Sequence, residues 1–515
     1  MRPGALTDDL LDRLRTRVTA GDATYTSTAV FTGGELATLP ESTTGDVTTA
    51  FERATRAQQA WAAADLSARL PVFERFHDLL LKNRDTVADL IQAETGKSRR
   101  DAFEELCEPA LVTSYYLRTA PKLLRPRKRA GLMPGAIGAA EHRRPKGVVG
   151  IISPWNYPFA LALGDLIPAL VAGNAVVLKP DSQTALSPLY GAELLYRAGL
   201  PEDLLQVVLG DGPTIGGAVV DTCDYIGFTG STRTGTQIAE RAGKRLVGCS
   251  LELGGKNPML VLDDVKIAAT AKNAVRGCFA NAGQLCLSIE RIYVHDSIFD
   301  SFAEAFVAET GKLRLSAGYD YGADIGSLTS QRALKTVAEH VDDARAKGAT
   351  VLTGGRPRPD LGPFFYEPTV LTDVTPEMLC HAAETFGPVV SLYPFASDEE
   401  AVALANQTEY GLNASVFGRD RTRAAAVGTR LRTGTVNIND GYASAYGSTD
   451  APMGGMGVSG LGRRHGAEGL LKYTEAQTIA TQRVTVLNPP RWVPYGLYTK
   501  VMAASLRLMR RIGLR

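Results

Sequence analysis

From Gly147 to Gly210 the sequence alternates between apolar runs of strand length and longer stretches of helical character. The runs GVVGIIS, AVVLKP and LLQVVLG are separated by ALGDLIPALVAG and SPLYGAELLYRAG. This rhythm predicts a parallel sheet with right-handed crossovers, because parallel strands need a long connection between them. The rhythm returns between about residues 256 and 440, where MLVLDD, RIYVHD and TVNIND read as strands. We therefore expect an α/β chain with two such units.

The other segments differ from this rhythm. Residues 1–45 are rich in Thr and Gly and predict an irregular arm, whereas residues 46–120 show helical periodicity, for example over 54–80 and 83–93. The basic stretch PKLLRPRKRAGLMPGAIGAAEHRR indicates a protruding linker or hairpin. The C-terminal segment YGLYTKVMAASLRLMRRIGLR has five basic residues and no acid, with Val501, Met502, Met509 and Ile512 as an apolar stripe. Such a helix either lies on a membrane surface or packs on a neighbouring subunit.

Length and composition restrict the class of protein. A chain of 515 residues is expected to form two or three domains, since a domain usually holds about 100–200 residues. With 22% charged residues, 44% hydrophobic residues and a net charge of +1, the chain gives no reason to expect a nucleic-acid partner. The start MRPGALTDDLLDRLRTR lacks the apolar core of a secretory signal, and no run reaches the roughly 18 apolar residues of a membrane span. A cytoplasmic location follows.

Cysteine and histidine spacing argues against a metal site. The six cysteines form no C-x-x-C pair, and no two of the six histidines stand four residues apart on a predicted helix. We expect no disulfide framework and no metal. Thiol chemistry in a reducing compartment remains open.

Two glycine-rich turns are candidates for a nucleotide site. LGDGPTIGG follows a predicted strand and spaces Gly210, Gly212 and Gly216 as G-x-G-x-x-x-G, one residue more than the usual dinucleotide fingerprint. YIGFTGSTRTG places Gly230 and Ser231 at a strand-to-helix turn, where backbone donors approach a pyrophosphate. An ordinary turn and an ordinary helix cap are the alternatives.

Three further residues have the context of a reactive site. Cys286 lies in FANAGQLCLSIERIYV, in a loop that leads into a strand, which is a usual place for a nucleophile. Glu252 stands between Leu251 and Leu253 before a Gly-Gly turn, where burial would raise its pKa and suit it to general base work. Asn156 follows the strand GVVGIIS at its carboxyl end. The alternatives are a buried structural thiol, a salt bridge from Glu252 to Lys256, and a turn asparagine.

The segments WNYP, LKPDS, FTGSTxxG, LELGGKNP, GQLC and ETFGP occur in this order over about 230 residues. The ordered set resembles the aldehyde dehydrogenase superfamily from about residue 45 to 485, and the whole chain looks most like its NADP-dependent succinate-semialdehyde dehydrogenases. The resemblance implies an α/β fold with an open-sheet dinucleotide-binding domain, an α/β catalytic domain and a small oligomerisation hairpin. The implied boundaries are 1–122 and 146–255 for the cofactor domain, 256–465 for the catalytic domain, 123–145 and 466–490 for the oligomerisation extension, and 491–515 for a basic amphipathic tail.

The resemblance also implies roles for individual residues. Cys286 is the nucleophile, Glu252 the general base, and Asn156 the donor that stabilises the oxyanion. The implied cofactor-binding residues are Trp155, Asn156, Lys179, Pro180, Asp181, Ser182, Gly212, Pro213, Gly230, Ser231, Leu253, Glu384 and Phe386. The expected cofactor is NADP, with NAD also accepted, because Ser182 stands where NAD-preferring relatives often carry Glu. A small-molecule aldehyde and a homodimer or homotetramer complete the expectation.

Departures from the family pattern concern the substrate. Gly457 replaces a usual Lys in APMGGMGVSGLGR. Arginines that hold a substrate carboxylate in succinate-semialdehyde dehydrogenases align with Gly164 and Ala280, while Ser448 matches a third, polar contact. Arg463 or Arg464 could substitute. Without a cation, the substrate is instead an uncharged aliphatic or aromatic aldehyde. A relative that acylates coenzyme A is disfavoured by Glu252, and a catalytically silent binding homologue is disfavoured by the three catalytic candidates together.

Overall fold

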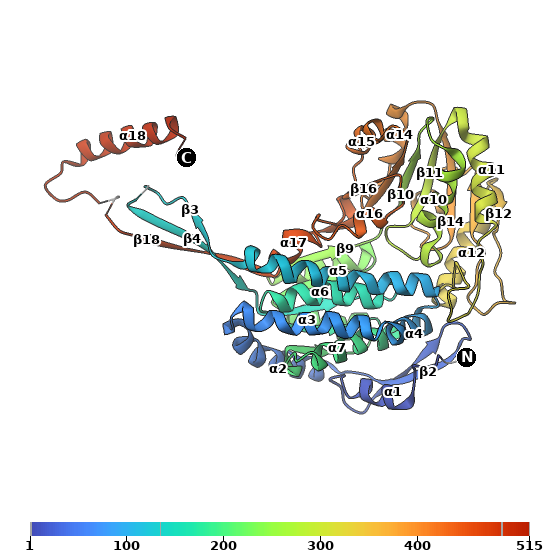
Figure 1. Ribbon diagram of the computed structural model, residues 1–515, viewed down its shortest axis with the longest axis horizontal. Helices are drawn as coiled ribbons and strands as arrows, with labels where there is room; N and C mark the ends of the chain where they lie inside the picture. Colours follow the sequence, from blue (N-terminus) through green and yellow to red (C-terminus); the bar gives the residue numbers. More distant parts are fainter. Residues whose placement is uncertain (1–2, 134, 486–487, 514–515) are drawn as a thin grey trace.

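The computed structural model describes residues 3–133, 135–485 and 488–513. Two α/β units form the body, and a long arm projects from it and ends near the C-terminus (Figure 1). The α/β class predicted from the alternating runs is confirmed. Each unit is built on its own sheet, and a hydrophobic core surrounds each sheet.

The first unit holds a six-stranded sheet of order β17-β9-β8-β5-β6-β7. The five strands β9 to β7 are parallel, and β17 is antiparallel to β9. Their bounds are β5 Val148–Ile152, β6 Ala175–Lys179, β7 Leu205–Val207, β8 Tyr225–Thr229, β9 Gly248–Glu252 and β17 Gly460–Leu461. Because β17 lies far along the sequence, the chain returns to the first sheet after it has formed the second unit.

Helices cover this sheet on both faces. The first helix after β5 is α6 (Pro158–Val171), and all of its residues are buried, as expected for a helix between a sheet and a helical layer. The remaining helices are α2 Thr44–Ala63, α3 Leu66–Lys82, α4 Arg84–Thr95, α5 Arg99–Leu124, α7 Leu186–Arg197, α8 Gly217–Thr222 and α9 Thr232–Lys244. The single helix expected over 54–80 is wrong, because Ala64 adopts an extended conformation (φ −69°, ψ 141°) that separates α2 from α3.

The second unit holds a seven-stranded sheet of order β12-β13-β14-β11-β10-β15-β16, parallel except for β12. Its strands are β10 Asn257–Val261, β11 Ile289–His295, β12 Thr350–Thr353, β13 Thr369–Thr372, β14 Val389–Phe395, β15 Asn413–Phe417 and β16 Thr435–Ile438. Its helices are α10 Ile267–Phe279, α11 Phe299–Thr310, α12 Gln331–Ala346, α13 Leu379–Ala382, α14 Asp398–Ala405, α15 Arg421–Gly428 and α16 Ala443–Tyr446.

The arm is a three-stranded antiparallel ribbon followed by a helix. Strand β18 (Thr474–Gln482) pairs along its whole length with β4 (Ile137–Pro145), and β3 (Arg127–Arg129) pairs with β4. The helix α17 (Gly466–Leu471) precedes the ribbon, and α18 (Tyr495–Arg511) lies beyond it at the far end (Figure 1). Across the described ranges, no helix combines the length and apolar character needed to cross a membrane.

The N-terminal segment is more ordered than its composition predicts. Residues 1–45 were expected to be irregular, yet the described part forms α1 (Asp8–Arg15) and a hairpin of β1 (Thr24–Ala29) and β2 (Gly34–Pro40). Leu10, Leu11 and Leu14 of α1 are buried in the first core. The Thr-rich run forms a strand because β-branched residues suit an extended backbone.

Candidate functional site

The carboxyl ends of β5, β8 and β9 meet at one cavity of about 400 Å³ between the two units. Parallel strands bring their following turns to the same edge, which is where open α/β sheets form ligand sites. Nine of the residues singled out in the sequence line this cavity: Trp155, Asn156, Gly230, Ser231, Glu252, Leu253, Cys286, Glu384 and Phe386.

Cys286 is presented by a tight loop between α10 and β11. Asn281 and Ala282 have positive φ values of 50° and 53°, and Gly283 follows with 72°. Such backbone is costly for residues other than glycine and persists where the surroundings impose it. A Cβ at Gly283 would meet the carbonyl oxygen of Gly387 at 2.0 Å, so this position also requires glycine for space.

Burial and neighbouring charges shift the pKa values of two ionisable groups that line the cavity, Glu252 and Cys286. Burial raises the pKa of Glu252 to about 7, while the nearby Arg464 opposes this shift. Burial, Glu384 and Glu252 raise the pKa of the Cys286 thiol to about 12. The thiol therefore needs a neighbouring base rather than spontaneous ionisation, and a carboxylate that titrates near neutrality meets that need.

The alternative of a Glu252–Lys256 salt bridge is wrong. The Nζ of Lys256 pairs with Glu290, whose carboxylate also accepts from the backbone N–H groups of Thr385 and Phe386. Glu252 is buried, and its Oε1 atom has no hydrogen-bond partner within the protein. Its carboxylate is thus available to the cavity.

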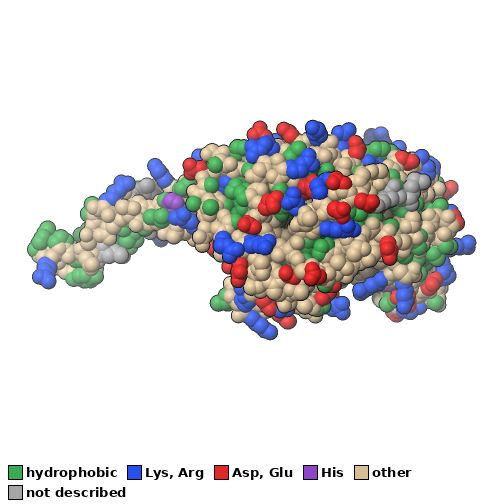
Figure 2. All heavy atoms as spheres, turned by 90° about the horizontal axis from the view of Figure 1, so that it is seen from below, with side chains coloured by type: hydrophobic (Ala, Val, Ile, Leu, Met, Phe, Trp, Pro, Cys, Tyr) green, Lys and Arg blue, Asp and Glu red, His purple; other side chains and the backbone are tan. Residues whose placement is uncertain are grey.

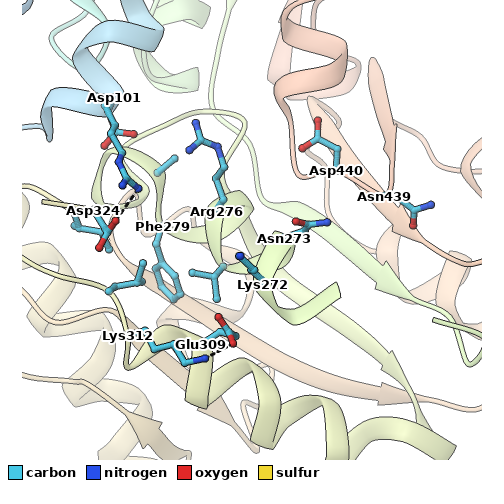
Figure 3. A pocket seen from close by; sticks show the side chains of 15 residues that line it. Asp101, Lys272, Asn273, Arg276, Phe279, Glu309, Lys312, Asp324, Asn439 and Asp440 are labelled. Atoms are coloured by element: carbon cyan, nitrogen blue, oxygen red, sulfur yellow. Dashed lines mark hydrogen bonds and ion pairs between the residues drawn. The ribbon is translucent and has the colours of Figure 1, made fainter. Parts of the chain in front are cut away.

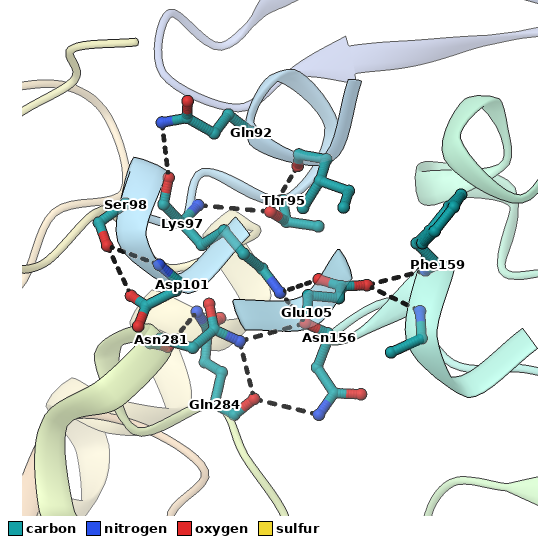
Figure 4. A network of polar contacts seen from close by, with 12 residues as sticks. Gln92, Thr95, Lys97, Ser98, Asp101, Glu105, Asn156, Phe159, Asn281 and Gln284 are labelled. Atoms are coloured by element: carbon teal, nitrogen blue, oxygen red, sulfur yellow. Dashed lines mark hydrogen bonds and ion pairs between the residues drawn. The ribbon is translucent and has the colours of Figure 1, made fainter. Parts of the chain in front are cut away.

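A buried polar network holds Asn156 (Figure 4). The Nδ2 of Asn156 donates to the carbonyl oxygen of Gln284 at 3.1 Å, which leaves its second N–H for a ligand. The carbonyl oxygen of Asn156 accepts from Lys97 Nζ at 2.7 Å and from Asn281 Nδ2 at 3.1 Å. The network thereby ties Asn156 to the loop that carries Cys286.

The remaining predicted cofactor residues lie beyond the cavity, at the ends of β6 and β7. Lys179 ends β6, and its Nζ donates to the carbonyl oxygen of Pro180 at 3.1 Å. Asp181 accepts from Gln183 N at 2.9 Å, and the Ser182 hydroxyl donates to the carbonyl oxygen of Gly210 at 3.0 Å. Gly212 and Pro213 are exposed at the start of the turn after β7.

These residues fit a dinucleotide. The N-terminus of α9, capped by the Ser231 hydroxyl on Thr234 N, opens into the cavity, where it suits a phosphate. A Cβ at Gly230 would meet the Phe228 ring at 2.5 Å, so only glycine keeps this turn open. At the other end of the cavity, the half-buried Glu384 accepts from Gly255 N at 2.9 Å, and burial and Glu290 raise the pKa of Glu384 to about 8.

Sequence reasoning missed Arg332 and Thr336, which line the same cavity from α12. They stand one helical turn apart, but nothing in the sequence marks this helix as part of the site. Of the two arginines considered as replacements, Arg464 borders a smaller cavity beside Cys286, whereas Arg463 Nη1 donates to the carbonyl oxygens of Gly455 and Gly462.

The positions where substrate arginines were expected have different surroundings. A Cβ at Gly164 would meet the carboxylate of Glu108 at 2.8 Å. Ala280 borders a separate cavity of about 560 Å³ (Figure 3), where Arg276 pairs with Glu104 and Lys312 with Glu309. Gly457 has a φ of 60°, and a Cβ added there would meet the carbonyl oxygen of Glu409 at 2.6 Å. The Ser448 hydroxyl donates to the carbonyl oxygen of Ser444.

Comparison with known proteins places this geometry in a family. The model of the aldehyde dehydrogenase family matches residues 18–479. The chain belongs to the aldehyde dehydrogenase family. A relative from Mycolicibacterium smegmatis, named "Putative succinate-semialdehyde dehydrogenase" of the NADP(+) type, is 56% identical over 94% of this chain and 93% of its own length.

Solved aldehyde dehydrogenase structures share the fold. A point mutant of betaine aldehyde dehydrogenase from Staphylococcus aureus, in complex with NAD+, is 31% identical with a TM-score of 0.87 over 93% of this chain and 97% of its own. A structure described as an E. coli NADP dependent enzyme is 33% identical with a TM-score of 0.87, over 92% and 99%. The family resemblance and the fold predicted from the ordered motifs are confirmed.

Proposed function

We propose that this aldehyde dehydrogenase uses Cys286, Glu252 and Asn156 to oxidise an aldehyde to its carboxylic acid, with NADP+ as the hydride acceptor. The observation that carries the proposal is that all three side chains line one cavity. A nucleophile, a base that titrates near neutrality and an amide donor are the groups that acyl chemistry through a thiol requires.

In the first half-reaction, Glu252 takes the proton of the Cys286 thiol, and the sulfur bonds to the aldehyde carbon. The negative charge on the former carbonyl oxygen is stabilised by the free N–H of Asn156 and by the backbone N–H of Cys286. A single donor of this kind is worth about 10²–10³ in rate. The bound cofactor supplies the acceptor for the hydride that leaves the carbon, and a thioester remains on Cys286.

Between the two half-reactions, Glu252 releases to solvent the proton that it took from the thiol. In the second half-reaction, a water molecule attacks the thioester carbon and gives a proton to the deprotonated Glu252. The carbon–sulfur bond breaks, the sulfur leaves as a thiolate, and the acid departs. Glu252 thus serves both halves, which suits a carboxylate whose pKa is about 7 because both of its protonation states are populated near neutral pH.

The predicted cofactor residues near the end of β6 favour NADP as the cofactor. Lys179 supplies positive charge at the end of β6, and Ser182 supplies a hydroxyl where a carboxylate would repel a 2′-phosphate. The names of the relatives that are 52–56% identical specify NADP(+), which supports the same choice.

Succinate semialdehyde is the substrate that the names of these relatives support. A second candidate is an uncharged aliphatic or aromatic aldehyde, and the surroundings of Gly164 favour it. Glu108 lies there with a buried side chain, and its Oε2 atom has no partner within the protein. Glu108 also lines a mainly apolar cavity of about 220 Å³. This cavity shares Tyr157, Leu285 and Tyr446 with the small cavity beside Cys286. A substrate carboxylate buried without a cation costs several kcal/mol.

The test is a substrate panel with a nucleophile control. Succinate semialdehyde, butanal, octanal and benzaldehyde are ranked by kcat/KM with NADP+, alongside Cys286→Ala, which should bind the cofactor and reduce none. If succinate semialdehyde exceeds butanal by more than about 10²-fold, or roughly 2.7 kcal/mol, a cation must hold its carboxylate. If butanal wins, the second candidate stands. Wild-type turnover by Cys286→Ala would contradict the whole scheme.

The projecting arm supports a second copy of this chain as the binding partner. Residues 123–145 and 474–515 carry thirteen Lys and Arg and two acids, a net charge of +11, while the whole chain has +1. The remainder therefore carries −10. The space-filling view shows hydrophobic and basic side chains along the arm, and both acidic and basic side chains on the body (Figure 2). The opposite net charges of the arm and the rest of the chain favour packing of the arm on a second copy of the chain.

A further inference from the structure

A small cavity of about 20 Å³ lies beside the proposed nucleophile, and Glu252, Cys286 and Arg464 all border it. A space of this size holds about one water molecule, since roughly 10–15 Å³ of such volume is enough for one. The cavity is distinct from the 400 Å³ cavity that suits a dinucleotide, because Arg464, Leu161 and Met453 line only the smaller one.

Three polar atoms of the residues around this space have no partner within the protein. They are the Oε1 of Glu252, the Nε of Arg464 and the hydroxyl oxygen of Tyr446. The side chains of Glu252 and Arg464 are buried, with exposed fractions of 7% and 5%. Buried polar groups in folded proteins are almost always hydrogen-bonded. Glu252 Oε1 is an acceptor, Arg464 Nε is a donor and the Tyr446 hydroxyl can act as either, so one water molecule that reached Glu252 and Arg464 would satisfy both of these atoms.

The remainder of the Arg464 guanidinium is fixed by the protein. Its Nη2 pairs with the Asp165 carboxylate and donates to the Thr229 hydroxyl at 2.9 Å. Asp165 is held in turn by Lys472 Nζ at 3.0 Å and by the Tyr473 hydroxyl at 2.9 Å. One end of the guanidinium is therefore held by the ion pair and the hydrogen bond, while its Nε–H has no partner within the protein. Arg464 also borders the small cavity.

We propose that Arg464 is a catalytic residue, whose Nε–H and the Glu252 carboxylate together hold the water molecule that hydrolyses the thioester on Cys286. The proposal rests on the thioester mechanism given above. The water oxygen accepts from Arg464 with one lone pair and attacks the thioester carbon with the other. Its proton passes to Glu252, the carbon–sulfur bond breaks, and the electron pair leaves with the sulfur.

The positive charge of Arg464 supports the same assignment. It opposes the effect of burial on the pKa of Glu252 and on the pKa of Cys286. A base beside this cation stays deprotonated nearer to neutral pH, and the thiolate that leaves in hydrolysis is stabilised by it.

The test separates the two half-reactions in Arg464→Lys, which keeps a cation near Asp165 but lacks the Nε–H. At pH 8.5, above the pKa of Glu252, stopped flow measures the first turnover of cofactor reduction, and quenched mass spectrometry measures the decay of the acyl-enzyme. We expect the first turnover to stay within about twofold and the decay to slow by about tenfold or more, the equivalent of roughly 1.4 kcal/mol.

Lys472→Met is the matched control, because it removes the other cation on Asp165 without bordering the cavity. It should leave the ratio of the two rates unchanged. Equal slowing of both rates in Arg464→Lys, or unchanged decay, would overturn the proposal. A second variant, Arg464→Gln, should in addition move the pH dependence of acyl-enzyme decay to higher pH. Failure of the thioester mechanism itself is distinguishable, because the wild type would then form no acyl-enzyme.

Discussion

The environment of Glu252 gives the clearest prediction of how the rate of acyl-enzyme hydrolysis depends on pH. Its carboxylate works as a base only when deprotonated, and burial raises its pKa to about 7. Hydrolysis of the acyl-enzyme should therefore rise with pH through about 7 and level off above it.

In Glu252→Gln this dependence should disappear, and hydrolysis should fall by about 10²–10⁴-fold, the usual contribution of a general base. Because Cys286 would ionise only near its raised pKa, cofactor reduction should also become slow at neutral pH and recover as the pH rises. Stopped flow across pH 6–10 measures both phases. A variant with the wild-type pH profile would assign the base to another group.

Ser182 is the residue on which cofactor choice is expected to depend. Ser182 lies three residues after the end of β6, and its hydroxyl donates to the carbonyl oxygen of Gly210. Ser182→Glu should place a carboxylate against the 2′-phosphate and lower the ratio of kcat/KM for NADP+ over NAD+ by about tenfold or more, or about 1.4 kcal/mol. Steady-state constants with both cofactors measure it, and Ser182→Ala controls for the lost hydroxyl. A strong preference of the wild type for NAD+ would contradict the assignment.

Residues near a recognisable motif could be predicted, whereas residues that reach the site from elsewhere could not. Cys286, Glu252 and Asn156 each follow or precede a strand in the sequence, and parallel strands bring such positions together. Arg332 lies in a helix with no such marker, and the orientation of Arg464 depends on its pairing with Asp165, some 300 positions away in the sequence. Contacts of this kind depend on tertiary packing alone.

At the scale of elements, the turn from α4 into α5 joins the two units. Lys97 lies there with a fully buried side chain that pairs with Glu105 (Figure 4). Its Nζ lies 3.8 Å from the centre of the Tyr157 ring. Glu105 also accepts from the backbone N–H groups of Phe159 and Ala160 at the start of α6. The position of Asn156 thus depends on a charge that is compensated inside the protein.

Lys97→Met should leave the Glu105 carboxylate buried without its cation and lower the free energy of unfolding by about 3–5 kcal/mol. Urea denaturation followed by fluorescence measures the change. Lys335→Met, which removes an exposed i,i+4 partner of Glu339, should change stability by less than about 1 kcal/mol. Equal stability of the two variants would show that the buried pair contributes no more than a surface pair.

The alternation of strands and helices was predictable because buried parallel strands appear as uninterrupted apolar runs. The short helix α1 and the β1–β2 hairpin were not. Eight residues of α1 give too few turns for a clear period, and its leucines become informative only when the core they enter is known.

For the whole molecule, the uneven charge is the property that the sequence alone could not place in space. The chain is nearly neutral, yet the described residues of the projecting arm carry twelve Lys and Arg and two acids, a charge of +10. At the end of the arm, α18 and the residue that follows it carry four apolar side chains that are each more than half exposed: Leu497, Val501, Leu508 and Ile512. Met509 of the same helix is buried. A row of exposed apolar side chains on a basic helix indicates a surface that another molecule covers.

We expect that covering molecule to be a second copy, and truncation after residue 490 tests it. Removal of the helix takes away the exposed apolar row and six of the seven basic residues that follow β18, so the oligomer should dissociate at a protein concentration where the full chain remains associated. Light scattering coupled to size exclusion measures the mass, and kcat per subunit should be retained because the tail does not line the catalytic cavities. Leu497→Ser with Val501→Ser should weaken association in the same way, whereas Lys500→Ala, which leaves the apolar row intact and removes one of many basic residues, should weaken it far less. If the mass is unchanged and the full chain instead sediments with vesicles of anionic lipid while the truncated chain does not, the helix binds a membrane surface and not a second copy.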